Sequence, residues 1–208
     1  MADTADLSTL GTPCLLLDEA RMERNIARIR GRLAGTGVRY RAHLKTAKSV
    51  EVARRQMETP AGPAMVSTLR EAEVFADAGV TDMTYGVGIA PDKLARVLAL
   101  RRRGVDLAVI LDSVGQAEAV AAASTPELPL AALIEIDCDG HRSGVKPDDA
   151  PLLTAIAAAL GPAPELRGVL THGGESYGAH GRAALEAAAE QERRGRQRGE
   201  VGHRRRPQ

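Results

Sequence analysis

Short apolar runs alternate with amphipathic segments along most of this 208-residue chain. The apolar runs are nearly continuous, which is typical of strands covered on both faces of a parallel sheet. The segments between them have helical periodicity, with apolar residues three and four positions apart. The predicted strands span residues 13–17, 38–44, 64–67, 82–89, 107–111, 130–136 and 166–171. The predicted helices span residues 19–34, 48–57, 72–79, 91–100, 113–123, 148–160 and 180–192.

The strand count limits the choice of α/β fold without deciding it. Counted from Val38, the pattern gives six β/α units. A closed (β/α)8 barrel of the TIM type needs eight units, whereas a doubly wound open sheet can stop at six, so the count leaves both folds open. No Gly-x-Gly-x-x-Gly follows the first strand, which disfavours a dinucleotide-binding sheet.

Composition narrows the class of protein. Hydrophobic residues make up 44% of the chain and charged residues 26%, as in ordinary globular domains. No apolar run approaches the length of a membrane span, and no basic segment followed by an apolar one begins the chain. Cys14 and Cys138 do not make a disulfide framework. We therefore expect a cytoplasmic protein with no membrane partner.

The last sixteen residues differ from the rest. Residues 193–208 hold seven Arg and one Glu, which leaves 21 basic and 26 acidic residues, a net charge of −5, in the remainder. A basic tail can bind RNA or an acidic partner, but the acidic body disfavours nucleic acid as a partner of the whole protein. An Arg/Gly-rich run is also typical of a shifted reading frame in GC-rich DNA. We expect a disordered or frameshifted tail.

Polar clusters follow several predicted strands, where β/α barrels carry their chemistry. The first contains Arg41, His43, Lys45 and Lys48. A lysine amine among cationic neighbours is a nucleophile that can form a Schiff base with an aldehyde, which suggests a pyridoxal-phosphate (PLP) enzyme. From composition alone, a surface lysine in a loop is the commoner case.

The second cluster follows the strand at 130–136. Glu135 and Asp137 share one face, and a glycine-bounded loop then presents Arg142. A guanidinium there can hydrogen-bond an anionic oxygen, whereas the alternative is a solvated loop with a local ion pair.

The third cluster spans residues 171–178. His172 and Tyr177 could contact a cofactor ring, and Gly173 and Gly174 would allow close backbone approach. A histidine satisfied within its own loop is the alternative. None of the five histidines has a short-spaced partner such as His-x-x-x-His, so we predict no metal site in this sequence.

Taken in order, these clusters resemble the barrel domain of fold-type III PLP enzymes, in particular the D-threonine aldolase and D-serine dehydratase branch of the alanine racemase superfamily. The agreement in order and spacing covers roughly residues 10–192. The matching motifs are Thr12-Pro13, Leu15-Leu16-Leu17-Asp18, Asn25-Ile26, Arg41-x-His43-x-Lys45-Thr46-x-Lys48, Glu135-Ile136-Asp137-x-x-Gly140-x-Arg142-x-Gly144 and Thr171-His172-x-Gly174-x-Ser176-Tyr177.

The resemblance implies roles for residues. Lys45 would bind PLP as a Schiff base and act as a base on the substrate. Arg142 would contact the phenolic oxygen, and His172 and Tyr177 would lie beside the ring. Arg41 and His43 would support the lysine.

The resemblance also implies an activity and partners. The reaction would be retro-aldol cleavage of D-threonine-like substrates or elimination from D-serine, so the partner would be a small D-amino acid. A divalent metal, Zn or Mn, would lie near the substrate β-hydroxyl, and full-length relatives would be homodimers.

The chain departs from this pattern in ways that shape our expectations. Ala42, Ala47 and Glu175 stand where the branch usually has Pro, His and His. From the resemblance, we also expect this sequence to lack the family's last two β/α units, its Gly-Ser-Thr phosphate-binding segment and its C-terminal β-domain with the metal ligands. We expect an N-terminal segment at 1–18 that would pair with that β-domain, an incomplete TIM-type barrel domain at 19–192 and a tail at 193–208.

These departures lead to a prediction of weak or no lyase activity. The alternatives are a non-catalytic PLP-binding protein and an interaction module that uses the basic tail.

Overall fold

The computed structural model describes residues 6–204. The chain divides into two compact units that meet between Tyr40 and Arg41, and each unit is described by itself. We expected a boundary between residues 18 and 19, with the helix at 19–34 in the barrel domain. In the structure this helix belongs to the first unit.

The first unit contains a short 3-10 helix, Leu7–Thr9, and α1, Glu19–Leu33. The Asp18 side chain caps α1 by accepting a hydrogen bond of 2.8 Å from Arg21 N, which explains why the helix begins there. The strand predicted at residues 13–17 is wrong in this structure. Leu15, Leu16 and Leu17 are exposed, and this segment pairs with no strand in the described part of the chain, so no ladder forms.

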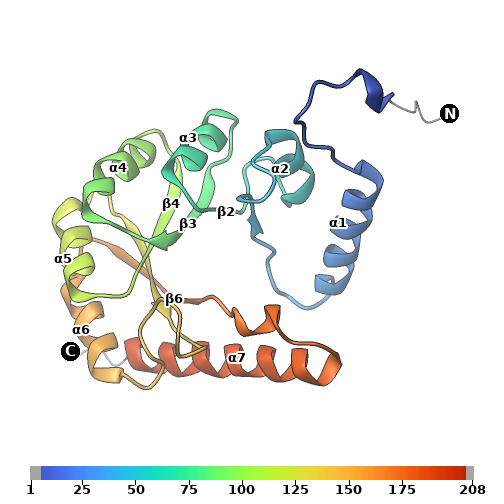
Figure 1. Cartoon of the computed structure of the whole chain (residues 1–208). Coiled ribbons are helices and arrows are strands. Elements are labelled where there is room, and N and C mark those ends of the chain that lie inside the picture. The colour runs from blue at the N-terminus through green and yellow to red at the C-terminus, as the bar shows by residue number, and fades with distance from the viewer. Residues whose placement is uncertain (1–5, 205–208) are drawn as a thin grey trace. The chain divides into compact units, whose positions relative to one another are not determined.

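The second unit is built on one six-stranded parallel sheet (Figure 1). Each strand pairs with its neighbours in sequence, in the order β1 to β6. This order is that of a β/α barrel, because a doubly wound sheet would reverse direction at a switch point. The incomplete TIM-type barrel with six β/α units is therefore confirmed. The strands are β1 Ala42–His43, β2 Ala64–Val66, β3 Asp82–Gly88, β4 Asp106–Leu111, β5 Ala131–Ile136 and β6 Glu165–Thr171.

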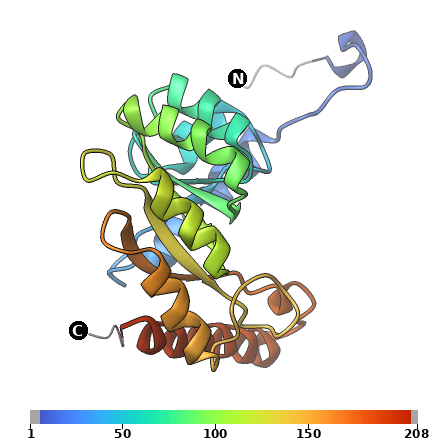
Figure 2. The same cartoon turned by 90° about the vertical axis from the view of Figure 1, so that its left-hand side faces the viewer.

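Helices follow the strands and cover the outer side of the curved sheet (Figures 1 and 2). The core lies between these two layers and consists mainly of aliphatic residues, with two buried aromatic side chains, Phe75 and Tyr85. Strand β4 is buried from Leu107 to Leu111, as expected for a central parallel strand. The helices are α2 Val50–Gln56, α3 Leu69–Asp77, α4 Leu94–Arg102, α5 Val114–Ala123, α6 Ala150–Ala159 and α7 Arg182–Arg204.

Side-chain caps fix where the helices begin. Ser49, Thr68, Ser113 and Asp149 each accept a hydrogen bond from the backbone N–H three residues later, at the start of α2, α3, α5 and α6. Such caps contribute about 1 kcal/mol each. Because each helix follows a strand, the caps also limit the length and freedom of the loops at the C-terminal ends of β1, β2, β4 and β5.

Helix α7 does not end at residue 192, as the sequence predicted, but continues to Arg204. Gly195 and Gly199 lie one turn apart and are buried against the sheet. A Cβ on Gly195 would stand 2.7 Å from Cys138 Cβ, and a Cβ on Gly199 would stand 2.7 Å from Ile136 Cδ1. The disorder expected for the tail is therefore wrong for residues 193–204, and the remaining four residues lie outside the described part.

Several arginines of α7 form ion pairs with carboxylates of the same helix. Arg193 and Arg194 both contact Glu190 at 2.7 Å, and Arg196 contacts Glu200 one turn further on. Hydrogen bonds from Arg193 and Arg194 lower the pKa of Glu190 to about 2. Exposed ion pairs of this spacing contribute little to stability because solvent screens them, so packing of the small residues against the end of β5 is the stronger reason for the helix to persist.

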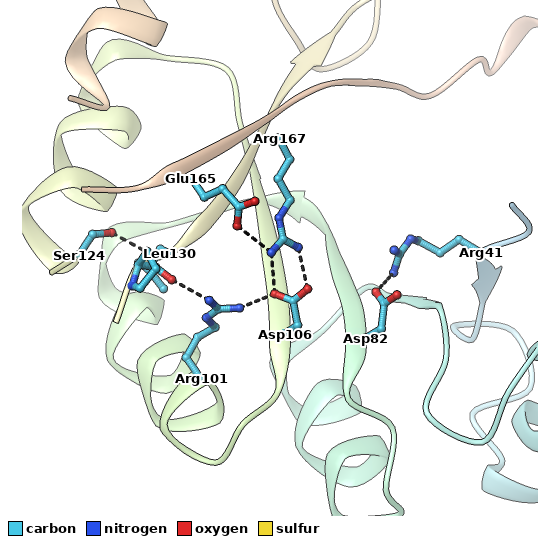
Figure 3. Close-up of polar contacts among 9 residues, drawn as sticks. Arg41, Asp82, Arg101, Asp106, Ser124, Leu130, Glu165 and Arg167 are labelled. Carbon is cyan, nitrogen blue, oxygen red and sulfur yellow. Dashed lines mark hydrogen bonds and ion pairs between the residues drawn. The ribbon is translucent and has the colours of Figure 1, made fainter. Parts of the chain in front are cut away.

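A charged cluster occupies the N-terminal ends of the strands (Figure 3). Arg41 contacts Asp82 at 2.7 Å, and Arg167 donates two hydrogen bonds of 2.8 and 2.9 Å to Asp106. Arg101 also contacts Asp106. The Arg41–Asp82 pair reaches across β2 and the Arg167–Asp106 pair across β5, so the cluster ties together strands that are not neighbours.

Candidate functional site

Strand β1 and the residue after its extension, Lys45, begin the site. His43 and Lys45 lie on one face of the extended chain. Ala42 and Leu44 are buried, whereas His43 is half-buried and Lys45 is exposed. The alternation is that of a strand, in which successive side chains point to opposite faces. Leu44 N donates to Met65 O at 2.9 Å, which continues the pairing with β2 up to Lys45.

His43 is linked to the lysine that follows it. Lys45 N donates to His43 Nδ1 at 3.4 Å, so the neutral ring carries its proton on Nε2, which lies 3.4 Å from Ser67 Oγ. Burial lowers the pKa of His43, and the charges of Lys45 and His172 lower it further against the opposing effect of Glu71. His43 is thus a neutral imidazole near pH 7.

The loop after β5 is shaped by one buried carboxylate. Asp137 Oδ1 accepts hydrogen bonds from the backbone N–H groups of Asp139, Gly140 and Arg142 at 3.2, 2.8 and 3.2 Å. Gly144 closes the loop with a φ of 116°, and a Cβ there would stand 2.6 Å from Asp137 N, so no other residue fits. The sequence therefore fixes where the Arg142 side chain leaves the backbone.

The loop after β6 is held by two further carboxylates. Asp139 Oδ2 accepts from Gly174 N at 2.6 Å, and Glu192 of α7 accepts from Gly173 N at 3.3 Å. These bonds hold the backbone that follows His172. Burial lowers the pKa of His172, and Arg142 and Lys45 lower it further. Gly173 and Gly174 thus allow close approach to protein side chains, including Glu192 and Arg142.

The three loops line one pocket of about 310 Å³ at the C-terminal ends of the strands. Four of the predicted residues, His43, Lys45, Arg142 and His172, are among its walls. The pocket combines one primary amine, one guanidinium and two imidazoles. Its amine and guanidinium suit an anionic group of a ligand. Its other walls are Met65, Ser67, Gly86, Val87, Gly88, Glu135, Ser143, Leu170 and Thr171.

Glu135 is the acidic member of the pocket. It is 8% exposed, and burial raises the pKa of its carboxyl, with the charges of Asp112 and Asp137 adding to the effect and Arg142 opposing it. A carboxyl with a raised pKa inside a pocket is a common feature of functional sites.

Two predicted residues do not line the pocket. Arg41 lies at the opposite end of β1, where its guanidinium bonds Asp82 and Ala64 O. Tyr177 is 73% exposed, and its ring centroid lies 6.1 Å from that of His172, with the rings inclined at 60°. The structure brings Tyr177 near the pocket rim and leaves Arg41 in the charged cluster.

Several wall residues were not predicted. Ser67, Gly86 and Gly88 come at the ends of β2 and β3. The rule that barrel chemistry lies at strand ends pointed to these positions, but small residues gave no chemical signal. A Cβ on Gly86 would stand 2.9 Å from Met65 Sδ, so a larger residue would alter the wall of the pocket.

A second cavity, of about 470 Å³, lies between α7 and the loop after β5. Its walls include Cys138, Glu190 and Arg194, and burial raises the pKa of the Cys138 thiol. Its carboxylate, Glu190, is already paired with Arg194, so we place the functional site in the smaller pocket. Among residues 6–204, no group of three or more His, Cys, Asp or Glu could hold a metal ion.

Comparison with known proteins gives the family. The sequence profile described as "Alanine racemase, N-terminal domain" matches residues 17–203. D-threo-3-hydroxyaspartate dehydratase of Delftia sp. (strain HT23) is 51% identical over 94% of this chain and 51% of its own length. 3-Hydroxy-D-aspartate aldolase of Paracoccus denitrificans is 35% identical over 85% of this chain and 46% of its own.

The solved structures agree with the sequence comparison. The structure of D-threo-3-hydroxyaspartate dehydratase from Delftia sp. HT23 has a TM-score of 0.89 at 49% identity, and the match covers 94% of this chain and 52% of that chain. Proteins named D-serine dehydratase and D-threonine aldolase are also similar, at 27% and 32% identity. The chain spans about half the length of the curated relatives it matches.

The fold is an arc of parallel strands, and a lysine, an arginine and two histidines lie at its C-terminal edge. This combination is that of a barrel-type domain of the PLP-enzyme class. The chain belongs to the alanine racemase N-terminal-domain family, within its fold-type III PLP branch. In the described part of the chain no helix is long and apolar enough to span a membrane.

Proposed function

We propose that this chain binds PLP through Lys45 and serves a lyase that acts on small D-3-hydroxy amino acids. The observation that carries the proposal is the meeting of Lys45, Arg142 and His172, from three separate strand ends, in one pocket. The whole reaction is proposed for a protein in which this domain has the partners found in its longer relatives, since the chain covers about half of their length.

The residues of the pocket fit PLP. Its volume of about 310 Å³ lies at the lower end of the range for small-molecule sites, about 300–1,000 Å³. Lys45 offers an amine to the aldehyde, and Arg142 offers a guanidinium to an anionic oxygen. Gly86 and Gly88 add no side chains of their own to the wall that they form with Met65 and Val87. When bound, PLP supplies an electron sink for the substrate carbon.

Each residue has a defined task in this proposal. Lys45 would hold the cofactor through its amine and would move a proton to or from the substrate Cα. Arg142 orients the cofactor through its phenolic oxygen. His172 flanks the ring as a neutral imidazole, with Tyr177 beside it, and His43 supports Lys45 through its backbone N–H.

Arg41 acts further from the chemistry. Its ion pair with Asp82 fixes the start of β1, so any support it gives to Lys45 passes through the strand. A homodimer, a divalent metal supplied outside the described residues and a cytoplasmic location remain predictions from the family resemblance.

The substrate class rests on the names of the relatives. The dehydratase and aldolase names share a D-3-hydroxy amino acid, 3-hydroxyaspartate. Elimination would remove the β-hydroxyl as water, and hydrolysis of the resulting imine would take up one water, so the net products would be ammonia and a 2-oxo acid. Retro-aldol cleavage would instead release glycine and an aldehyde. We propose a lyase of one of these two kinds.

The proposal is tested by titrating the purified chain with PLP, trapping the adduct with borohydride and mapping the modified peptide. We expect a visible absorption band and a label on Lys45, both lost in Lys45→Ala. Lys146→Ala, which removes an exposed lysine outside the pocket, should leave both unchanged. Labelling spread over many lysines and unaffected by Lys45→Ala would refute the assignment.

Activity is tested separately with D-threo-3-hydroxyaspartate, D-threonine and D-serine, each with and without Zn²⁺ or Mn²⁺. Ammonia without glycine indicates elimination, and glycine indicates cleavage. Specific PLP binding at Lys45 without either product would favour the non-catalytic PLP-binding function for the isolated chain.

A further inference from the structure

A buried carboxylate lies behind the pocket without lining it. Glu71, in the first turn of α3, is 7% exposed. Its Oε2 accepts a hydrogen bond of 2.8 Å from Ser67 N. Its Oε1 is buried and accepts no hydrogen bond within residues 6–204, but Lys48 Nζ lies 3.3 Å away. Burying a carboxylate is costly unless a charge or hydrogen bonds compensate, so both contacts matter.

A helix cap explains only part of this arrangement. Thr68 Oγ1 accepts from Glu71 N at 3.0 Å, and Glu71 in turn accepts from the backbone just before the helix, much as in a capping box. A glutamine serves equally well at this position of a capping box. The cap therefore requires no charge, and it does not explain a contact to Lys48, which belongs to another loop.

Lys48 has an unusual backbone conformation. Its φ is 49°, and it is the one residue other than glycine with a positive φ in the described part of the chain. This left-handed conformation is uncommon for a residue with a side chain. Lys48 N donates to Leu44 O at 3.1 Å, which closes the turn that contains Lys45. The same residue therefore closes the turn and reaches the buried carboxylate.

Glu71 also reaches the pocket by a second route. The Ser67 that donates its N–H to Glu71 has its hydroxyl 3.4 Å from His43 Nε2. His43 Nδ1 in turn lies 3.4 Å from Lys45 N. One carboxylate thus connects to both sides of the Lys45 turn.

We infer that Glu71 is a positioning residue for Lys45, because its buried carboxylate fastens the Lys45 turn to the loop between β2 and α3. The consequence for PLP rests on the function proposed above. The contacts of Glu71 with the Lys45 turn exist in the chain without cofactor. The positioning role of Glu71 and the proposed PLP binding can therefore be refuted independently of each other.

Glu71→Gln separates positioning from capping. Glutamine preserves the cap, so the melting temperature should stay close to that of the wild type. We expect PLP to bind about 3- to 10-fold more weakly and the Lys48 N–H to exchange with solvent faster in the cofactor-free chain. The control is Glu73→Gln on the same helix, whose carboxylate pairs with Arg96 at 2.8 Å and which should change neither measurement.

A double-mutant cycle with Lys48→Gln tests the pair directly. Each single variant should weaken PLP binding similarly, and the double variant should be no weaker than either. Lys48 is 61% exposed, so its replacement keeps the inference testable even where Glu71→Gln lowers the melting temperature. Additive effects, or wild-type PLP affinity and exchange rate in both single variants, would overturn the inference. If the wild-type chain binds no PLP, the proposed function fails, and the exchange rates alone decide the role of Glu71.

Discussion

The Arg142 side chain lies directly against the backbone of Gly174. A Cβ on residue 174 would stand 2.7 Å from Arg142 Nη1 and 2.9 Å from its Cδ. Gly174 has a φ of −93°, which any residue adopts, so the missing side chain makes room for Arg142 rather than for an unusual backbone. The loops after β5 and β6 are therefore fitted to each other around the guanidinium, before any cofactor binds.

Gly174→Ala should displace the guanidinium and weaken PLP binding by about tenfold, the loss expected for one charge-assisted contact. The melting temperature should change little, because the clashing atoms belong to a flexible side chain. Gly178→Ala in the same loop is the control, since its Cβ would meet only Glu175 O at 3.9 Å. Equal PLP affinity of the two variants, measured by absorbance titration, would show that Arg142 does not hold the cofactor.

Lys45→Ala should raise the pKa of both His43 and His172 in the cofactor-free chain. Burial is the first cause that lowers both values, and the Lys45 charge contributes to each. Removing that charge relieves the repulsion of both imidazolium forms. NMR titration of the imidazole protons measures the change, and Lys146→Ala, outside the pocket, should leave both values as they are. A shift of one histidine alone would contradict a shared pocket.

Much of the fold followed from the period of the apolar residues. The strand β1 is shorter than predicted because its partner β2 has only three residues and pairs through Ala42 and His43. The end of α7 was misread because Gly195 and Gly199 suggest a break in a helix. These glycines let α7 pack closely against Ile136 of β5 and the following Cys138, a contact that is visible only in the structure. Local sequence carries no information about such tertiary packing.

The candidate site was predicted from sequence motifs, and the structure places only some of the predicted residues in the pocket. Arg41, His43 and Lys45 lie within five residues of one another near the end of a predicted strand, so the sequence grouped them as one cluster. The pocket, however, occupies only the C-terminal end of the sheet, and Arg41 lies at the other end beside Asp82. Glu71 carried no signal beyond that of a helix cap, because its second partner, Lys48, lies 23 positions earlier in the chain.

Asp106→Asn should reduce stability at neutral pH and lose this effect in acid. Partial burial opposes ionisation, but Arg167 and Arg101 outweigh it and hold the pKa of Asp106 below its usual value. A lowered carboxyl pKa contributes stability above the unfolded pKa of about 3.9, which is lost as the pH falls through the folded pKa. Because the side chain is 42% exposed, we expect a loss of only about 1 kcal/mol at pH 7.

Urea unfolding of the wild type and Asp106→Asn between pH 3 and pH 7 measures this contribution. The difference in the free energy of unfolding should shrink as the pH falls below about 4. Asp77→Asn is the control, because its pair with Arg103 is more exposed, at 65% for the carboxylate. A difference that does not depend on pH would show that the charge of Asp106 is not what links β4 to β6.

Gly195→Ala should destabilise the second unit although alanine favours helices. The substitution gains up to about 1 kcal/mol of helix propensity. It also places a methyl group 2.7 Å from Cys138 Cβ and 3.2 Å from Cys138 Cα. Backbone atoms cannot move aside cheaply, and overpacking costs about 1–3 kcal/mol. We therefore expect a net loss of about 1–2 kcal/mol in the free energy of unfolding, measured in urea.

Gly115→Ala in the first turn of α5 is the control. Its Cβ would meet nothing within 4 Å, so this substitution should be neutral or stabilising. A stabilising Gly195→Ala would show that the last turns of α7 do not pack on β5 in solution.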